Sequence, residues 1–130
     1  MIKRVAIIFA VGFVLNATWE LLQMPLYIVD VSRWHYWALC LRAGVWDALI
    51  ITGVYCLIDT SSKKTRYVVS TILCLFIAIF IEQRALGEGK WAYSTLMPRM
   101  GGIGILPLIQ LPFLAVISYT IAERFGYTKK

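Results

Sequence analysis

Hydrophobic residues fall into four long runs, which are separated by short stretches rich in polar residues, glycine and proline. The runs cover residues 5–24, 37–58, 67–86 and 103–122. A helix rises about 1.5 Å per residue, so about 20 apolar residues cross the hydrocarbon core of a bilayer. The pattern therefore predicts an all-α fold, an integral membrane bundle of four transmembrane helices in a single domain over residues 1–130.

The composition supports a membrane protein. Of the 130 residues, 60% are hydrophobic and 15% are charged, whereas about 25% are charged in an average soluble domain. So small a soluble body would lack the interior to hide this much apolar surface. The basic residues are scattered between long uncharged runs, so we expect no nucleic-acid partner. Three cysteines without a CxxC pair give no disulfide framework or metal motif, and we expect neither a metal nor a cofactor.

The positive charges predict the orientation. With four spans, both termini and the loop between the second and third spans lie on one side of the membrane. Lysines and arginines on that side number eight: Lys3, Arg4, Lys63, Lys64, Arg66, Arg124, Lys129 and Lys130. The opposite side has five: Arg33, Arg42, Arg84, Lys90 and Arg99. The positive-inside rule then places both termini in the cytoplasm of a multi-pass protein of the cell (inner) membrane. No small-residue cleavage site follows the first run, so it is predicted to be a retained span rather than a signal peptide.

Polar residues inside the spans are the features that need an explanation, because a charged residue near the bilayer centre costs about 2.5–3.5 kcal/mol. Asn16, Glu20 and Gln23 follow an i, i+4, i+7 spacing, so they share one helix face, which we expect to point into the bundle. Other polar residues fall at a similar depth near the outer surface. The candidate catalytic residues are Glu20, Asp47 and Glu82, and the candidate ligand-binding residues are Asn16, Gln23, Arg42, Arg84, Trp91, Tyr93, Arg99 and Gln110.

Simpler structural roles stay open for several of these residues. Asp47 would be favoured by the positive end of a helix if the buried part of the second span begins near Ala43. Trp91 and Tyr93 have the composition of interfacial anchors. The whole layer could also be a hydrogen-bonded network that joins the helices without any ligand. Gln110 lies between Pro107 and Pro112, and each proline is expected to kink the fourth helix.

The three carboxyl groups are the residues most suited to chemistry. They would be neutral acids where no cation is near, and ionised where an arginine such as Arg42, Arg84 or Arg99 lies beside them. A pair of carboxyls in unequal environments can act as acid and base. No GxSxG, HExxH or phosphate-binding motif accompanies them. The residues therefore favour proton transfer or simple binding over hydrolysis.

Two stretches carry a resemblance to known proteins. They are N-A-T-W-E-L-L-Q-M-P-L-Y in the first run and the segment from Glu82 to Gln110, with W-A-Y, M-P, G-I and P-L-I-Q. The chain resembles small bacterial multi-pass membrane proteins of unassigned function. It is more distantly similar to membrane carotenoid-pathway proteins of the lycopene cyclase and carotenoid hydratase type, although no P-x-E-E acid pair follows its prolines. The resemblance implies an apolar ligand.

Three functions remain open at this point. The polar layer could bind or convert an apolar lipid- or isoprenoid-like molecule, with or without enzymatic activity. It could serve a small proton- or cation-coupled transporter subunit, or it could be the structural core of an accessory subunit. The expected partners are the lipid bilayer, an apolar small molecule and a second copy of the chain.

Overall fold

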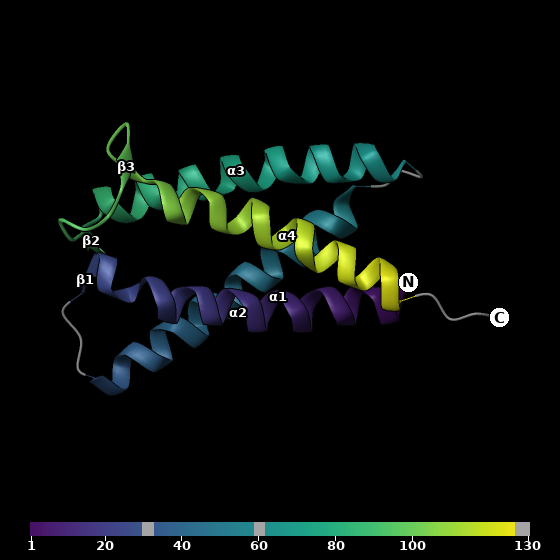
Figure 1. Ribbon diagram of the computed structural model, residues 1–130, viewed down its shortest axis with the longest axis horizontal. Helices are drawn as coiled ribbons and strands as arrows, with labels where there is room; N and C mark the ends of the chain where they lie inside the picture. The colour runs from purple at the N-terminus through teal and green to yellow at the C-terminus, as the bar shows by residue number, and fades with distance from the viewer. Residues whose placement is uncertain (30–32, 59–61, 127–130) are drawn as a thin grey trace.

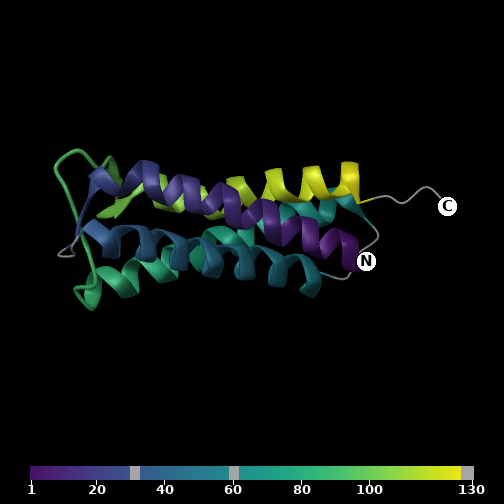
Figure 2. The ribbon, with the colours of Figure 1, turned by 90° about the horizontal axis from the view of Figure 1, so that it is seen from below.

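The structure, a computed structural model, describes residues 1–29, 33–58 and 62–126. Four long helices alternate in direction along the long axis of the molecule, as two perpendicular views show (Figure 1, Figure 2). They are α1 (Ile2–Gln23), α2 (Arg33–Leu57), α3 (Lys63–Gly87) and α4 (Ile105–Phe125). Each is long and apolar enough to cross a membrane. The predicted helical architecture is therefore confirmed. α1, α2 and α3 begin three or four residues before their apolar runs, and α4 ends three residues after its run.

The second helix differs from one expectation in a way that matters for Asp47. α2 is continuous from Arg33 to Leu57, with no break near Ala43. Asp47 therefore lies in the interior of a long helix, several turns from its N-terminus, where the helix dipole no longer favours an anion. No proline interrupts this stretch of sequence, and a single glycine, Gly44, does not suffice to end a helix that packs well.

The prolines act at different points of the fold. Pro25 lies in a short 3₁₀ helix, η1 (Met24–Leu26), and α1 ends just before it. Pro107 lies in the first turn of α4, where the backbone N–H has no partner within the helix, so the kink expected there is wrong. Pro112 lies inside α4 and removes the hydrogen bond that its nitrogen would have donated one turn back.

Short strands cover one end of the bundle, where the sequence predicted only loops. β1 (Tyr27–Ile28) pairs antiparallel with β2 (Ala92–Tyr93), and β3 (Arg99–Met100) pairs with β4 (Ile103–Gly104). The tight turn between β3 and β4 consists of Gly101 and Gly102, with φ values of 59° and 82°. Two positive φ angles in succession suit a two-residue hairpin, and glycine adopts them without strain. The β1–β2 pair joins the end of α1 to the segment that follows α3 (Figure 1).

The helices do not pack evenly around the bundle. α1 packs most extensively against α2 and α4, and α3 packs mainly against α4, whereas α2 and α3 touch little. The half nearer the termini is filled by an apolar cluster that includes Ile8, Ile51 and Tyr119, all fully buried. The Tyr119 hydroxyl donates a hydrogen bond to the carbonyl oxygen of Ile51 at 2.8 Å.

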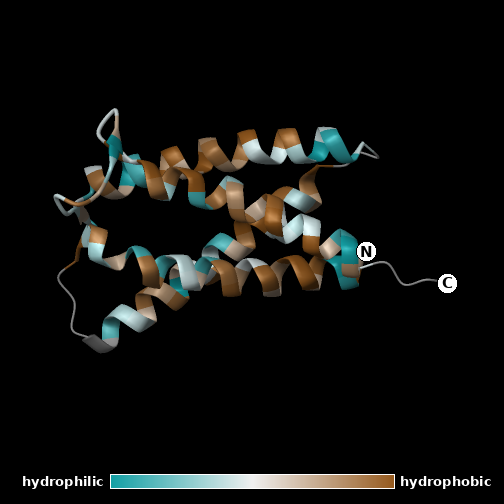
Figure 3. Ribbon diagram, in the orientation of Figure 1, coloured by the Kyte–Doolittle hydropathy of each residue, from teal (hydrophilic) through white to brown (hydrophobic). Residues whose placement is uncertain are grey.

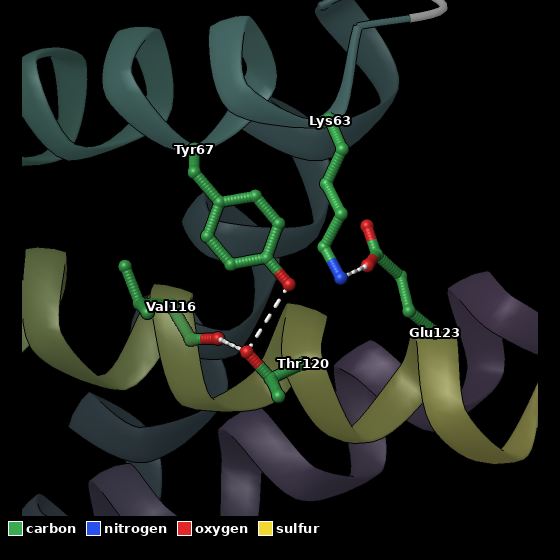
Figure 4. Close-up of polar contacts among 5 residues, drawn as sticks. All are labelled: Lys63, Tyr67, Val116, Thr120 and Glu123. Carbon is green, nitrogen blue, oxygen red and sulfur yellow. Dashed lines mark hydrogen bonds and ion pairs between the residues drawn. The ribbon is translucent and has the colours of Figure 1, made fainter.

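Polar contacts join α3 to α4 at the end that carries both termini (Figure 4). Lys63 Nζ lies 2.7 Å from Glu123 Oε2. The hydroxyls of Tyr67 and Thr120 are 3.1 Å apart, and Thr120 also donates to the carbonyl oxygen of Val116 at 2.8 Å. Because the Lys63 side chain is mostly exposed, its ion pair stabilises the protein by no more than about 1 kcal/mol.

Apolar and polar residues are also separated along the helix axes. Hydrophobic residues cover most of the middle of the helices, and hydrophilic residues gather towards the two ends (Figure 3). Many large apolar side chains are exposed on the bundle, among them Val14, Phe76, Phe80 and Phe113. The outer surface of the bundle therefore matches the environment of a bilayer better than that of water.

α1 and α2 approach each other closely at Gly44, and this contact gives a first testable prediction. A Cβ atom at Gly44 would lie 3.0 Å from both the backbone nitrogen and the Cβ of Ala17 on α1. We expect Gly44→Ala to lower the free energy of unfolding in detergent by about 1–3 kcal/mol, because α1 and α2 would be forced apart. Thermal or chemical unfolding followed by circular dichroism measures this change.

Gly53 provides the matched control on the same helix. A Cβ there would meet nothing within 4 Å. Gly53→Ala should leave stability unchanged or raise it by up to about 1 kcal/mol, since alanine favours helix. An equal loss of stability in both variants would show that the close contact at Gly44 does not limit the packing.

Candidate functional site

The side-chain amide of Gln110, on α4, lies at the centre of the polar layer. Its Nε2 donates to Glu20 Oε1 at 2.9 Å, to Asp47 Oδ2 at 3.0 Å and to Asn16 Oδ1 at 3.1 Å. One nitrogen therefore joins α4 to α1 and α2. An amide nitrogen carries only two hydrogens, so three acceptor oxygens compete for the two N–H groups of Gln110.

The orientation of this amide is fixed by its other end. Gln23 Nε2 donates to Gln110 Oε1 at 3.0 Å, and Trp19 Nε1 in turn donates to Gln23 Oε1 at 2.9 Å. Because the Gln23 amide donates to the oxygen of Gln110, the nitrogen of Gln110 must face the carboxyls of Glu20 and Asp47. Asn16, which is fully buried, uses its own Nδ2 to donate to the carbonyl oxygen of Gly12 at 2.7 Å. The expectation that Asn16 and Gln23 point into the bundle is confirmed by their burial.

Glu82, on α3, forms a second polar group with the aromatic residues of the strands. The side chain is 5% exposed. Its Oε2 accepts hydrogen bonds from the Tyr93 hydroxyl and from Trp91 Nε1, the latter at 3.4 Å. The ring of Tyr27 lies across from both aromatics, with centroid distances of 5.5 Å to Tyr93 and 6.0 Å to Trp91. Three aromatic rings thus gather around one carboxyl at the covered end of the bundle.

The two tyrosines are held in their neutral, donating form. Burial raises the pKa of Tyr27 far above its ordinary value, and the negative charges of Glu82 and Glu20 raise it further. Burial likewise raises the pKa of Tyr93, as does its hydrogen bond to Glu82. Both phenols therefore keep their protons at neutral pH, which allows Tyr93 to act as a hydrogen-bond donor to the carboxyl.

A cavity of about 1050 Å³ connects these two polar groups. It draws its walls from all four helices, and α2 and α3, which touch each other little, contribute many of the residues. Glu20, Asp47, Glu82 and Gln110 line it. Its remaining surface is largely apolar and includes Leu39, Ala43, Trp46, Ile50, Ala78, Ile81, Leu86 and Leu111. The site is thus a mainly apolar cavity with three carboxyl groups on its wall and two exposed cationic residues, Arg42 and Lys90, in its lining.

Arg84 and Arg99 bind groups other than the three carboxyls of the cavity. Arg84 Nε is 2.7 Å from Glu88 Oε1, one turn further along the chain. Lys90 Nζ is 3.1 Å from Glu88 Oε2, and the hydrogen bond from Lys90, together with the charges of both cations, lowers the pKa of Glu88. Arg99 lies over the ring of Tyr93 at 5.4 Å and donates to its backbone oxygen.

The carboxyls in the cavity consequently have no cation bound to them in the described parts of the chain. There, the ion pairs of lysine and arginine involve Glu88 and Glu123 but none of the three cavity carboxyls. Arg42 lines the cavity at an exposed position without pairing to them. Over the same residues, no group of three or more His, Cys, Asp or Glu side chains is arranged to hold a metal ion.

Some residues of the site were not among the sequence candidates. Trp19 orients Gln23 from one turn away on the same helix, and this i, i+4 spacing could have identified it. Cys40 lines the cavity from α2, although its position in an apolar run made it look like an ordinary core residue. Tyr27 had no comparable pattern, since only the pairing of β1 with β2 brings it to Glu82.

Comparison of the chain with protein-family models, curated proteins and solved structures yields no match. The likeness to carotenoid-pathway proteins therefore stays an expectation, and the function has to be argued from the cavity and its side chains.

The dependence of three helices on one amide gives a second prediction. We expect Gln110→Leu to lower the free energy of unfolding by about 1–3 kcal/mol, because the acceptors on α1 and α2 lose their shared donor. Unfolding in mixed detergent, monitored by circular dichroism, measures the loss. Gln83→Leu is the matched control, since Gln83 is exposed on α3 and its replacement should change stability by less than about 0.5 kcal/mol. Equal stabilities of the two variants would contradict a structural role for the shared donor.

Proposed function

We propose that this protein is a multi-pass protein of the cell membrane that binds an apolar, lipid- or isoprenoid-like molecule in the cavity between α2 and α3. The observation that carries the proposal is the cavity itself, which combines a long apolar wall with a few polar side chains. Small-molecule sites are generally concave and mostly apolar, with a small number of polar groups that orient the ligand.

Insertion in a membrane is supported by the outer surface of the bundle. All four helices meet the length and composition needed to cross a bilayer. Their outward side chains include Phe76, Phe80 and Phe113, which are each more than half exposed in the isolated chain. Lipid would cover these side chains and also deliver an apolar ligand directly to the cavity.

The proposed orientation has both termini in the cytoplasm. The start of α1, the end of α2, the start of α3 and the end of α4 lie at the same end of the bundle, whereas the strands lie at the other (Figure 1). Among the described residues, the end with the termini carries Lys3, Arg4, Lys63, Lys64, Arg66 and Arg124. The cavity, with its carboxyls, would then lie in the outer half of the membrane.

Reporter fusions test this orientation. A green fluorescent protein fused after the C-terminus should fluoresce, and alkaline phosphatase at the same point should be inactive, because only the first folds in the cytoplasm. Fusions placed after Lys90 should give the reverse result. Active phosphatase at the C-terminus would overturn the proposed orientation and leave the cavity unaffected.

A binding site is favoured over a transport pathway by the other half of the bundle. The cluster around Ile51 and Tyr119 fills the interior towards the termini with apolar side chains. Water or an ion would find few polar partners there, and such partners are needed along a membrane pathway. The carboxyls of the cavity could additionally exchange a proton with a bound molecule, so acid–base chemistry is the reaction class that this site could add to binding.

Retention of a small molecule during gentle purification is the direct test. We expect mass spectrometry of an organic extract of the purified protein to show an apolar compound at near-stoichiometric amount. Ile81 lines the cavity, so Ile81→Trp places a larger side chain where the ligand would lie. This variant should reduce the retained amount by roughly tenfold or more, since overfilling a site costs about 1–3 kcal/mol.

Ile72→Trp is the matched control for this experiment. It makes the same substitution on α3 at a residue that is about half exposed and lies half a turn away around the helix axis. This variant should retain as much of the compound as the unaltered protein. Retention that is equal in both variants, or absent in the unaltered protein, would remove the support for a binding cavity.

A further inference from the structure

The carboxyl groups of the cavity offer a bound molecule hydrogen-bond acceptors. Beside Glu20 and Asp47, the amide donor Gln110 Nε2 is already shared among three acceptors, and Glu82 already accepts the Trp91 N–H. The two cationic residues of the lining, Arg42 and Lys90, are exposed, and Lys90 pairs with Glu88. A ligand group that itself only accepts hydrogen bonds would therefore find no partner at the carboxylates or at Gln110 Nε2. A ligand that donates hydrogen bonds would supply the carboxyl oxygens with the donors that they lack.

The two neighbouring carboxyl groups also favour a ligand that carries a positive charge. Glu20 Oε1 and Asp47 Oδ2 approach the same nitrogen to within 2.9 and 3.0 Å, so the two oxygens are no further apart than the sum of these distances. Two ionised carboxylates this close would repel each other strongly in surroundings of low dielectric constant, so without a cation beside them the pair favours keeping a proton. No lysine or arginine of the described chain pairs with either of them. A cation on the ligand would relieve this repulsion.

The aromatic residues provide a third, independent feature. Tyr27 and Trp91 both line the cavity, and their rings stand edge to face at an interplanar angle of 89°. Aromatic faces attract organic cations, and protein sites for quaternary ammonium ligands use such rings. Glu82 lies beside this pair and accepts the Trp91 N–H.

We propose that the molecule bound in the cavity is an amphiphile with an apolar chain and a protonated amine at one end. The ammonium group would lie among Glu20, Asp47 and Glu82, with Tyr27 and Trp91 beside it. The apolar chain would lie along the wall formed by residues such as Ala43, Ile50 and Ile81. This inference rests on the proposed function, because it specifies the polar end of a ligand whose apolar part that function requires.

Competing head groups test the proposal in the purified, full-length protein. The probe is dodecylamine with a photoreactive diazirine at the end of its chain, added at a low mole fraction of the detergent micelles. Unlabelled dodecylamine, dodecanol and dodecanoic acid then compete with it for crosslinking at neutral pH. We expect the amine to halve crosslinking at a mole fraction roughly tenfold lower than the alcohol or the acid, as a charge-assisted hydrogen bond to a carboxylate would require.

Two variants link that preference to the carboxyls. Asp47→Asn and Glu20→Gln each remove one carboxyl group that can carry a negative charge beside a bound ammonium, so either variant should bring amine and alcohol to within about threefold of each other. Two positions are used so that a folding defect in one leaves the other as the test. Glu123→Gln is the matched control, because Glu123 pairs with Lys63 at the opposite end of the bundle, and it should keep the full preference for the amine.

The outcomes separate this inference from the function on which it rests. Equal competition by all three head groups, or stronger competition by the acid through Arg42, would overturn the inference that the ligand carries an amine. Either result would leave the proposal of a binding cavity in place. Crosslinking that Ile81→Trp does not reduce would instead show that the probe lies outside the cavity, and the proposed function would fail with it. A preference for the amine that persists unchanged in Asp47→Asn and Glu20→Gln would also overturn the inference.

Discussion

A single buried amide determines how three of the four helices meet. Gln110 is fixed at its oxygen by Gln23, so its nitrogen faces Asn16, Glu20 and Asp47. In a low-dielectric interior an unpaired polar group is costly, which makes the alignment of α1, α2 and α4 depend on the position of one side chain. The shortage of donors at this point is also what leaves carboxyl oxygens available on the cavity wall.

The uneven packing of the bundle follows from the distribution of polar and small residues. Gly44 lets α1 and α2 approach closely, and the apolar cluster around Tyr119 closes the half nearer the termini. In the other half, α2 and α3 touch little, and the strand pair between β1 and β2 covers the space that results. The cavity is therefore bounded by well-packed helices on one side and by a hydrogen-bonded cap of aromatic residues at its end.

The sequence predicted the helices well, because apolar runs of sufficient length have few alternatives in a membrane. It also placed Asn16, Glu20 and Gln23 on one face, since helical periodicity alone decides this. It could not decide which cations would meet the carboxyls. Arg84 binds Glu88 instead, and this choice depends on the rotamers of exposed side chains rather than on spacing. The role of Tyr27 depends on a two-residue strand pair between segments far apart in the chain, which no local pattern reveals.

The position of Gln110 along the chain has a consequence for how the protein is made. Asn16, Glu20 and Asp47 belong to the first two helices, whereas the amide that all three contact lies in the last. During synthesis from the N-terminus, α1 and α2 are therefore made before the partner of their polar groups exists. Those groups must be accommodated by water, by protons or by a neighbouring protein until α4 arrives. Assembly of the site and completion of the fold are then one event, and a chain that stops before α4 carries its acidic groups without the residue that organises them.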